Sequence, residues 1–173
     1  MTLYVIFKKA VFVKSLSIRR TEERREIAEA ELNSRLFFRF LQSANTLQKQ
    51  GTKALHEYGI TTHQGSVLGA LSRPQSDQGM SVKELSDYLM MSRQNLTGIL
   101  NRLDHLGLIH RLRDENDGRT KRVGLTALGL EKWMALEPLL DQFYLKALQG
   151  FSFDVKIDFL AQVNRLLGNM KKT

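Results

Sequence analysis

The side chains best suited to chemistry lie along one face of a predicted helix near the middle of the chain. Gln94, Thr97 and Asn101 share that face at 100° per residue, and Arg93 and Arg102 lie on its flanks. An amide pairs bidentately with adenine, a guanidinium group with guanine, and a threonine methyl group contacts that of thymine. The pattern favours reading of base edges in DNA, although an ordinary solvated helix face would also carry these side chains.

Gly98 lies on the same face of the predicted helix. A glycine inside a helix lowers its stability by about 1 kcal/mol relative to alanine. A close approach of this face to a groove wall or to another helix would account for a residue without a side chain here.

The residues before this face predict a second, shorter helix and a tight turn. Ser81 and Glu84 have the S-x-x-E spacing of a capping box, and Ser92 is placed to cap the helix that carries the polar face. The apolar stripe on the opposite face of that helix consists of Leu96, Ile99, Leu100, Leu103 and Leu106. Two helices joined in this way form a helix-turn-helix, whose second helix enters a major groove.

A basic hairpin is predicted to follow, with strands over 108–113 and 121–125. Asp117-Gly118 is a strong turn signal between them. Asp117 precedes Arg119 by two residues, so a charge-assisted pair would hold the Arg119 guanidinium in one direction. An arginine fixed at a hairpin tip suits a narrow minor groove, whose negative potential attracts it, and a salt bridge that only stabilises the loop is the alternative.

The sequence around this hairpin resembles the signature of the MarR family of winged-helix transcriptional regulators. The matching pattern is Asp114-x-x-Asp117-x-Arg119-x-x-x-Val123-x-Leu125-Thr126-x-x-Gly129. Helices are predicted before and after it in the family's order, so the resemblance covers about residues 25–170. It implies a homodimer in which the first and last helices of both chains intertwine and two wings straddle a palindromic operator on double-stranded DNA.

The resemblance also implies site residues and a regulatory role. The residues expected to contact DNA are Ser92, Arg93, Gln94, Asn95, Thr97, Gly98, Asn101, Arg102, Asp117, Arg119, Lys121 and Arg122. Family members are most often repressors, and many bind a small aromatic effector between the dimer helices and the DNA-binding region. The residues expected to line such a pocket here are Phe37, Phe40, His56, Tyr58 and His63.

Long helices are predicted on both sides of the DNA-binding region, which spans residues 59–125. The helices at 22–58 and 154–170 carry more apolar surface than a monomer easily hides, so we expect residues 21–58 and 126–173 to form a dimerisation region. The predicted fold class is mainly α with a small β-hairpin wing: a winged helix-turn-helix core flanked by N- and C-terminal dimerisation helices. Thr21 is the predicted cap of the first long helix, and Thr61 with Gln64 has the spacing of a capping box for the next one. Thr126 is placed to cap the helix after the hairpin, and a last helix is predicted to begin near Asp154.

Residues 1–20 form an N-terminal arm that matches nothing around it. Leu3, Val5 and Phe7 alternate with other side chains in a way that suits a strand, but no partner strand is evident. An ordered arm and a disordered extension remain equally open from the sequence.

Composition narrows the functional classes. A net charge of +8 favours an anionic partner, and the absence of cysteine excludes disulfides and zinc–thiolate sites within the chain. The four histidines lack metal-ligand spacing, so we expect no metal and no cofactor. No stretch approaches the roughly 18–20 apolar residues of a membrane span, and we expect a cytoplasmic protein without a membrane partner.

Two other functional classes compete with DNA binding. A winged-helix module that binds protein would keep the same core but would not need a polar recognition face. An enzyme ranks third, because no phosphate-binding loop, nucleophile elbow or pair of buried carboxylates is visible in the sequence.

Overall fold

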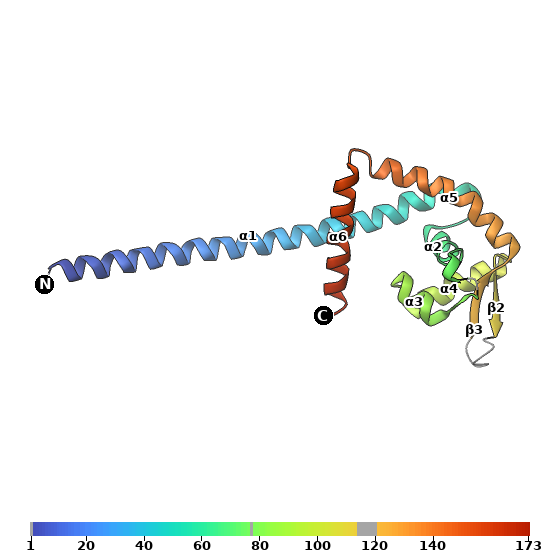
Figure 1. Cartoon of the computed structure of the whole chain (residues 1–173), viewed down its shortest axis with the longest axis horizontal. Helices are drawn as coiled ribbons and strands as arrows, with labels where there is room; N and C mark the ends of the chain where they lie inside the picture. The colour runs from blue at the N-terminus through green and yellow to red at the C-terminus, as the bar shows by residue number, and fades with distance from the viewer. Residues whose placement is uncertain (1, 77, 114–120) are drawn as a thin grey trace. The chain divides into compact units, whose positions relative to one another are not determined.

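The computed structural model describes the backbone of residues 2–76, 78–113 and 121–173, and the side chains of residues 22–76, 78–111 and 122–173. The chain divides into two compact units, Met1–Gln48 and Lys49–Thr173. Helices dominate the described residues, and one small antiparallel sheet lies in the second unit (Figure 1). The prediction of a mainly α fold with a small β wing is confirmed.

The first helix, α1, spans Thr2–Ala54 and begins well before the start predicted at Thr21. The first 50 residues contain neither proline nor glycine, so no residue type interrupts a helix there. The alternation in residues 3–7 belongs to this helix, and the strand interpretation is wrong. A strand without a partner leaves backbone groups unpaired, whereas a helix pairs them internally.

The end of the first helix agrees with the sequence. After α1, a short 3-10 helix, η1, spans His56–Tyr58, and Gly59 follows with a left-handed φ of 68°. Helix α2 spans Thr62–Leu71, and the predicted capping box of Thr61 and Gln64 is confirmed in both directions. A second 3-10 turn, η2, spans Pro74–Ser76.

The helix-turn-helix consists of α3, Val82–Leu89, and α4, Arg93–His105. The side chain of Ser81 accepts from the backbone of Glu84, and that of Ser92 accepts from the backbone of Asn95, so both predicted caps are confirmed. Met90 takes a left-handed φ of 52° in the turn between the two helices. The tight turn is therefore set by local backbone geometry next to two well-capped helices.

The sheet has one strand more than predicted. Strands β2, Ile109–Arg113, and β3, Lys121–Leu125, form the expected antiparallel hairpin, in which Arg111 lies opposite Val123. A two-residue strand, β1, Met80–Ser81, pairs with the other edge of β3, which gives the order β1-β3-β2. No alternation can be recognised in two residues, so the sequence carries no signal for β1.

Two helices complete the second unit. Helix α5 spans Ala127–Ala147, is capped by Thr126 as predicted, and continues through Pro138. Helix α6 spans Phe153–Met170 and is capped by Ser152, close to the start predicted at Asp154. Among the described residues, no helix combines the length and the apolar character needed to cross a membrane.

The core of the second unit lies between α2, α3, α4, α5 and the sheet. Its fully buried large side chains are Leu55, Val67, Leu68, Leu85, Leu96, Leu100, Leu103, Val123 and Leu136. Each such side chain contributes about 1.5–3 kcal/mol relative to an exposed one. Helix α4 is therefore held rigidly by its apolar face, as the predicted stripe requires. Leu106, the last residue of the predicted stripe, follows the end of α4 and is 47% exposed, so it does not belong to this core.

Candidate nucleic-acid interface

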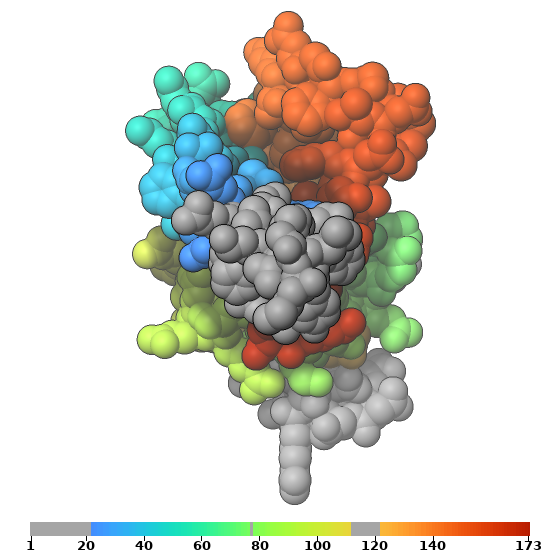
Figure 2. Space-filling view, turned by 90° about the vertical axis from the view of Figure 1, so that its left-hand side faces the viewer, coloured from blue at the N-terminus to red at the C-terminus, as the bar shows by residue number. Residues whose placement is uncertain are grey.

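The polar face of α4 is exposed along its whole length. The predicted contact residues Ser92, Arg93, Gln94, Asn95, Thr97, Gly98, Asn101 and Arg102 are all exposed, while the opposite face of the helix is buried. Yellow-green atoms from the α3–α4 region form part of the surface at the lower left of Figure 2. The structure thus brings eight of the twelve predicted DNA-contacting residues together on one capped helix.

Two residues on this face have local environments that bear on base reading. The hydroxyl of Thr97 donates to the carbonyl of Arg93 over 2.7 Å, so its methyl group is the part left for contact with a thymine methyl group. A Cβ added at Gly98 would meet no atom of the described residues within 4 Å. A neighbouring helix within the described chain therefore does not explain Gly98, and an approach to a groove wall stays a prediction.

Arg111 is a residue of this surface that the sequence did not single out. Its Nη2 donates to Oδ1 of Asn101 over 2.6 Å, and its Nε lies 3.3 Å from Oδ2 of Asp104. Strand β2 is thereby tied to the polar face of α4. The signal was present in the alternation of β2, which puts Arg111 on the same side as the buried Ile109.

The wing is described only at its base. Its strands pair from Ile109 with Leu125 to Arg113 with Lys121, which fits the predicted hairpin. Lys121 is the first residue of β3, and its side chain is outside the described residues. Asp117 and Arg119 are also outside them, so their pairing and their contact with a minor groove stay predictions.

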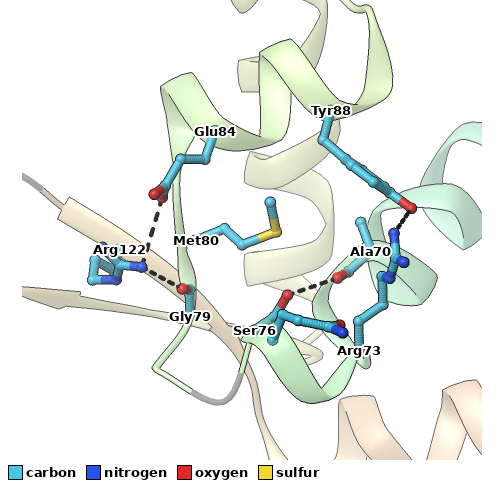
Figure 3. Close-up of a pocket in the computed structure, with 9 residues that line it drawn as sticks. Ala70, Arg73, Ser76, Gly79, Met80, Glu84, Tyr88 and Arg122 are labelled. Carbon is cyan, nitrogen blue, oxygen red and sulfur yellow. Dashed lines mark hydrogen bonds and ion pairs between the residues drawn. The ribbon is translucent and has the colours of Figure 1, made fainter.

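Arg122 contacts other parts of the protein. Its Nε donates to the carbonyl of Gln78 over 3.0 Å and its Nη2 to that of Gly79 over 2.7 Å. The same Nη2 forms an ion pair with Oε2 of Glu84 (Figure 3), at 3.6 Å, and the Arg122 side chain is only 26% exposed. Arg122 thus ties β3 to the loop before β1 and to α3, and its predicted contact with DNA stays untested.

A shallow cavity of about 400 Å³ lies beside this arginine, between α2, β1, α3 and β3. Arg73 stacks on the ring of Tyr88 and donates to its hydroxyl, with 5.1 Å from the guanidinium carbon to the ring centroid (Figure 3). The cavity contains none of the residues predicted to bind an effector.

The predicted effector residues are divided between the two units. Phe37 and Phe40 lie in the first unit and are 53% and 42% exposed. His56, Tyr58 and His63 lie in the second, where Lys132 Nζ is 5.8 Å from the ring centroid of Tyr58 and 3.4 Å from its carbonyl oxygen. A pocket shared by these five residues stays a prediction. Among the described residues, no three histidine or acidic side chains gather as metal ligands would.

Comparison with known sequences identifies relatives of this chain. A model of the MarR family matches residues 58–120. The chain is 44% identical over 146 residues to the transcriptional activatory protein BadR of Rhodopseudomonas palustris. The aligned residues make up 84% of this chain and 83% of the relative. It is also 29% identical over 103 residues to the HTH-type transcriptional regulator SarZ of Staphylococcus epidermidis, and these residues make up 60% of this chain and 68% of the relative.

Solved structures show the same fold. A MarR/EmrR family transcriptional regulator from Acinetobacter sp. ADP1 superposes with a TM-score of 0.74 at 19% identity, covering 82% of this chain and 98% of the other. MepR of S. aureus in complex with DNA gives a TM-score of 0.68 at 23% identity, covering 76% of this chain and 93% of the other. The family match and the relative at 44% identity lead to one conclusion, with which the fold agrees: the chain belongs to the MarR family of DNA-binding, winged-helix transcriptional regulators.

Proposed function

We propose that this protein is a homodimeric regulator that reads a palindromic operator, with α4 of each protomer in a major groove and Arg119 of each wing in a flanking minor groove. The observation that carries the proposal is the polar face of α4, whose residues from Ser92 to Arg102 are exposed on a helix held rigidly by buried leucines. A helix presented in this way has the geometry and the donors and acceptors that base reading needs.

Exposed apolar side chains support the homodimer. Helix α6 has 18 residues and buries none of its side chains, and Phe153 and Leu160 on it are 76% and 60% exposed. In the first unit, Leu36 and Phe38 of α1 are likewise 59% and 62% exposed. Apolar faces of this extent mark interaction surfaces, and a second copy of the chain would also supply the second half-site reader of a palindrome.

Selection from a random duplex pool tests the proposal with the full-length protein. We expect enrichment of a palindrome whose half-sites lie roughly one helical turn apart. Affinity should fall steeply with salt, because a dimer that neutralises about 6–10 phosphates releases that many counterions. Sedimentation equilibrium should give a dimer. A stable monomer, or binding without sequence preference at low salt, would contradict the proposal.

A matched pair of variants locates the reading face. Gln94→Ala should change the selected consensus, because an amide that pairs with a base is lost. Gln75→Ala removes the same side chain from an exposed position on η2, outside the proposed interface, and should leave the consensus unchanged. The same consensus for Gln94→Ala and wild type would mean that the recognition face is misassigned.

The sign of regulation has two candidates. Repression is what the family resemblance implies, whereas the relative from R. palustris is named an activatory protein, which favours activation. A reporter gene under the selected operator decides between them: repression lowers expression when the operator overlaps the promoter, and activation raises it when the operator lies upstream. We place this regulation in the cytoplasm, as the sequence predicts.

A small aromatic effector is part of the proposal. Such an effector would shift the protein between two conformations, with different affinities for the operator, only if it binds one conformation more tightly than the other. Titration of aromatic acids and phenols into the protein–operator complex should release or tighten DNA binding, and Phe40→Ala should weaken that response. Unchanged operator affinity across the series would contradict an effector of this class.

The alternative function, a protein-binding module without DNA specificity, is excluded if the random duplex pool yields an enriched palindrome.

A further inference from the structure

Arg111 joins the wing to the recognition helix through two polar side chains of α4. Its guanidinium group donates from Nη2 to Oδ1 of Asn101 over 2.6 Å. Its Nε lies 3.3 Å from Oδ2 of Asp104, three residues further along the same helix. Two acceptors on one helix therefore hold both the position and the direction of this guanidinium group.

The strand pattern explains why an arginine reaches this place. Ile109 and Arg111 point to the same side of β2, and Arg111 lies opposite Val123 of β3. Ile109 and Val123 are 2% and 1% exposed, so this side of the hairpin faces the core. Arg111 is the next residue on that side, and 32% of its side chain is exposed. The aliphatic part of the Arg111 side chain thus starts on the core side of the sheet, and its guanidinium group reaches Asn101 and Asp104 of α4.

The chemistry of the pair determines how Asn101 is oriented. An arginine side chain has only donors, so the atom of Asn101 that meets it must be the carbonyl oxygen. The amino group of Asn101 therefore points away from Arg111. Without that bond, an exposed carboxamide can turn by half a rotation and exchange its donor and its acceptor. With it, Asn101 presents one fixed order of donor and acceptor.

We propose that Arg111 is a positioning residue for base recognition: it fixes the carboxamide of Asn101, so the wing strand contributes to sequence specificity through the recognition helix. This inference rests on the proposed function, in which Asn101 faces a base edge. A preorganised carboxamide discriminates better between bases, because no second orientation is available for pairing with the wrong one.

The test measures the affinity of the full-length dimer for each of the four bases at every position of the operator that the wild type selects. Asn101→Ala identifies the position that Asn101 reads. Arg111→Met, which keeps much of the stem but removes the donors, should reduce the preference for the cognate base at that same position by about tenfold. The double variant should lose no more discrimination there than Asn101→Ala alone, because Arg111 acts at this position only through Asn101 and both changes remove the same interaction.

Three further variants separate positioning from charge and from folding. Arg111→Lys keeps the charge without the planar fork, so it should retain overall affinity but lose discrimination at that position. Asp104→Asn loosens Arg111 from its second acceptor and should give a smaller loss at the same position. Arg73→Met is the matched control, because it removes an exposed arginine outside the proposed interface, and it should leave every base preference unchanged.

The outcomes distinguish this inference from the proposed function. If Arg111→Met weakens binding equally for all bases at all positions, Arg111 is only a phosphate contact and the positioning role is wrong, while operator reading stands. If the wild type shows no sequence preference, the proposed function itself fails and the inference falls with it. If Arg111→Met does not fold, Arg111→Lys and Asp104→Asn decide the matter by the position at which they lose discrimination.

Discussion

Gly129 packs against the backbone of Leu108 so closely that a Cβ added to it would lie 1.9 Å from the Leu108 carbonyl oxygen. The contact joins the start of α5 to the residue before β2, and the same carbonyl accepts from the backbone of Thr126 over 3.2 Å. Only glycine fits between these two backbone segments. The last position of the signature from Asp114 to Gly129 therefore has a structural reason, which is the docking of α5 onto the base of the wing.

Gly129→Ala should destabilise the fold by about 1–3 kcal/mol or more, because the atom in the way belongs to the backbone and cannot rotate aside. Urea unfolding of the full chain measures the change. Gly98→Ala is the control, since a Cβ there meets nothing within 4 Å in the described chain, and it should not destabilise. Equal stability of Gly129→Ala and wild type would contradict the close contact.

Gly69→Ala should disturb the packing of α2 on α5. A Cβ there would lie 2.6 Å from Cη2 of Trp133, so we expect a loss of about 1–3 kcal/mol. Trp133 is the single tryptophan of the chain, and its fluorescence should report the shift directly. Trp133→Phe, which removes part of the ring, should recover stability when combined with Gly69→Ala. Purely additive effects of the two changes would speak against a direct contact.

Gly98→Ala should separate stability from DNA binding. The added methyl group meets open space among the described residues and raises helix propensity, so the free energy of unfolding should rise by about 0.5–1 kcal/mol. If the helix face approaches a groove wall here, operator affinity should fall by about 1–3 kcal/mol, the usual cost of overpacking. Anisotropy titration with the selected operator measures it. Unchanged affinity would show that the groove wall stays clear of this position.

Arg122→Ala should lower stability more than it lowers DNA affinity. The guanidinium group donates to the carbonyls of Gln78 and Gly79, and hydrogen bonds to charged groups contribute about 1.5–3 kcal/mol. Arg122→Lys keeps the charge but cannot satisfy both carbonyls in the same way, so it should remain destabilised. A variant with native stability and weak operator binding would instead make Arg122 a DNA contact.

Arg119→Ala should weaken operator binding by about 1–3 kcal/mol and leave folding intact, because its proposed partner is the minor groove. A gel shift with the selected operator measures the affinity, and a thermal melt checks the fold. Lys121→Ala provides the contrast: it should lower affinity for all sequences and reduce the salt slope by about one counterion. Wild-type affinity of Arg119→Ala would refute the role of the wing.

The caps and turns could be predicted because their causes are local. Thr61 with Gln64, and Ser81 with Glu84, are pairs of residues three positions apart, so the sequence displays both partners of each hydrogen bond together. The polar face of α4 and its buried leucines follow in the same way from helical periodicity. The start of α1 could not be predicted from a cap at Thr21, because a capping residue that lies inside a longer helical stretch does not begin a new helix.

By itself, the sequence determined the order of the predicted elements, the ends of most helices and the exposed polar face of α4, since these depend on neighbours within one or two helical turns. Only the tertiary structure decided how the arginines are used. Arg122 meets carbonyls 43 and 44 residues earlier in the chain, and Arg111 meets Asn101 ten residues earlier on a different element. A guanidinium group binds whatever acceptors the packing of helices and strands brings to it, and that packing is not encoded in any short pattern.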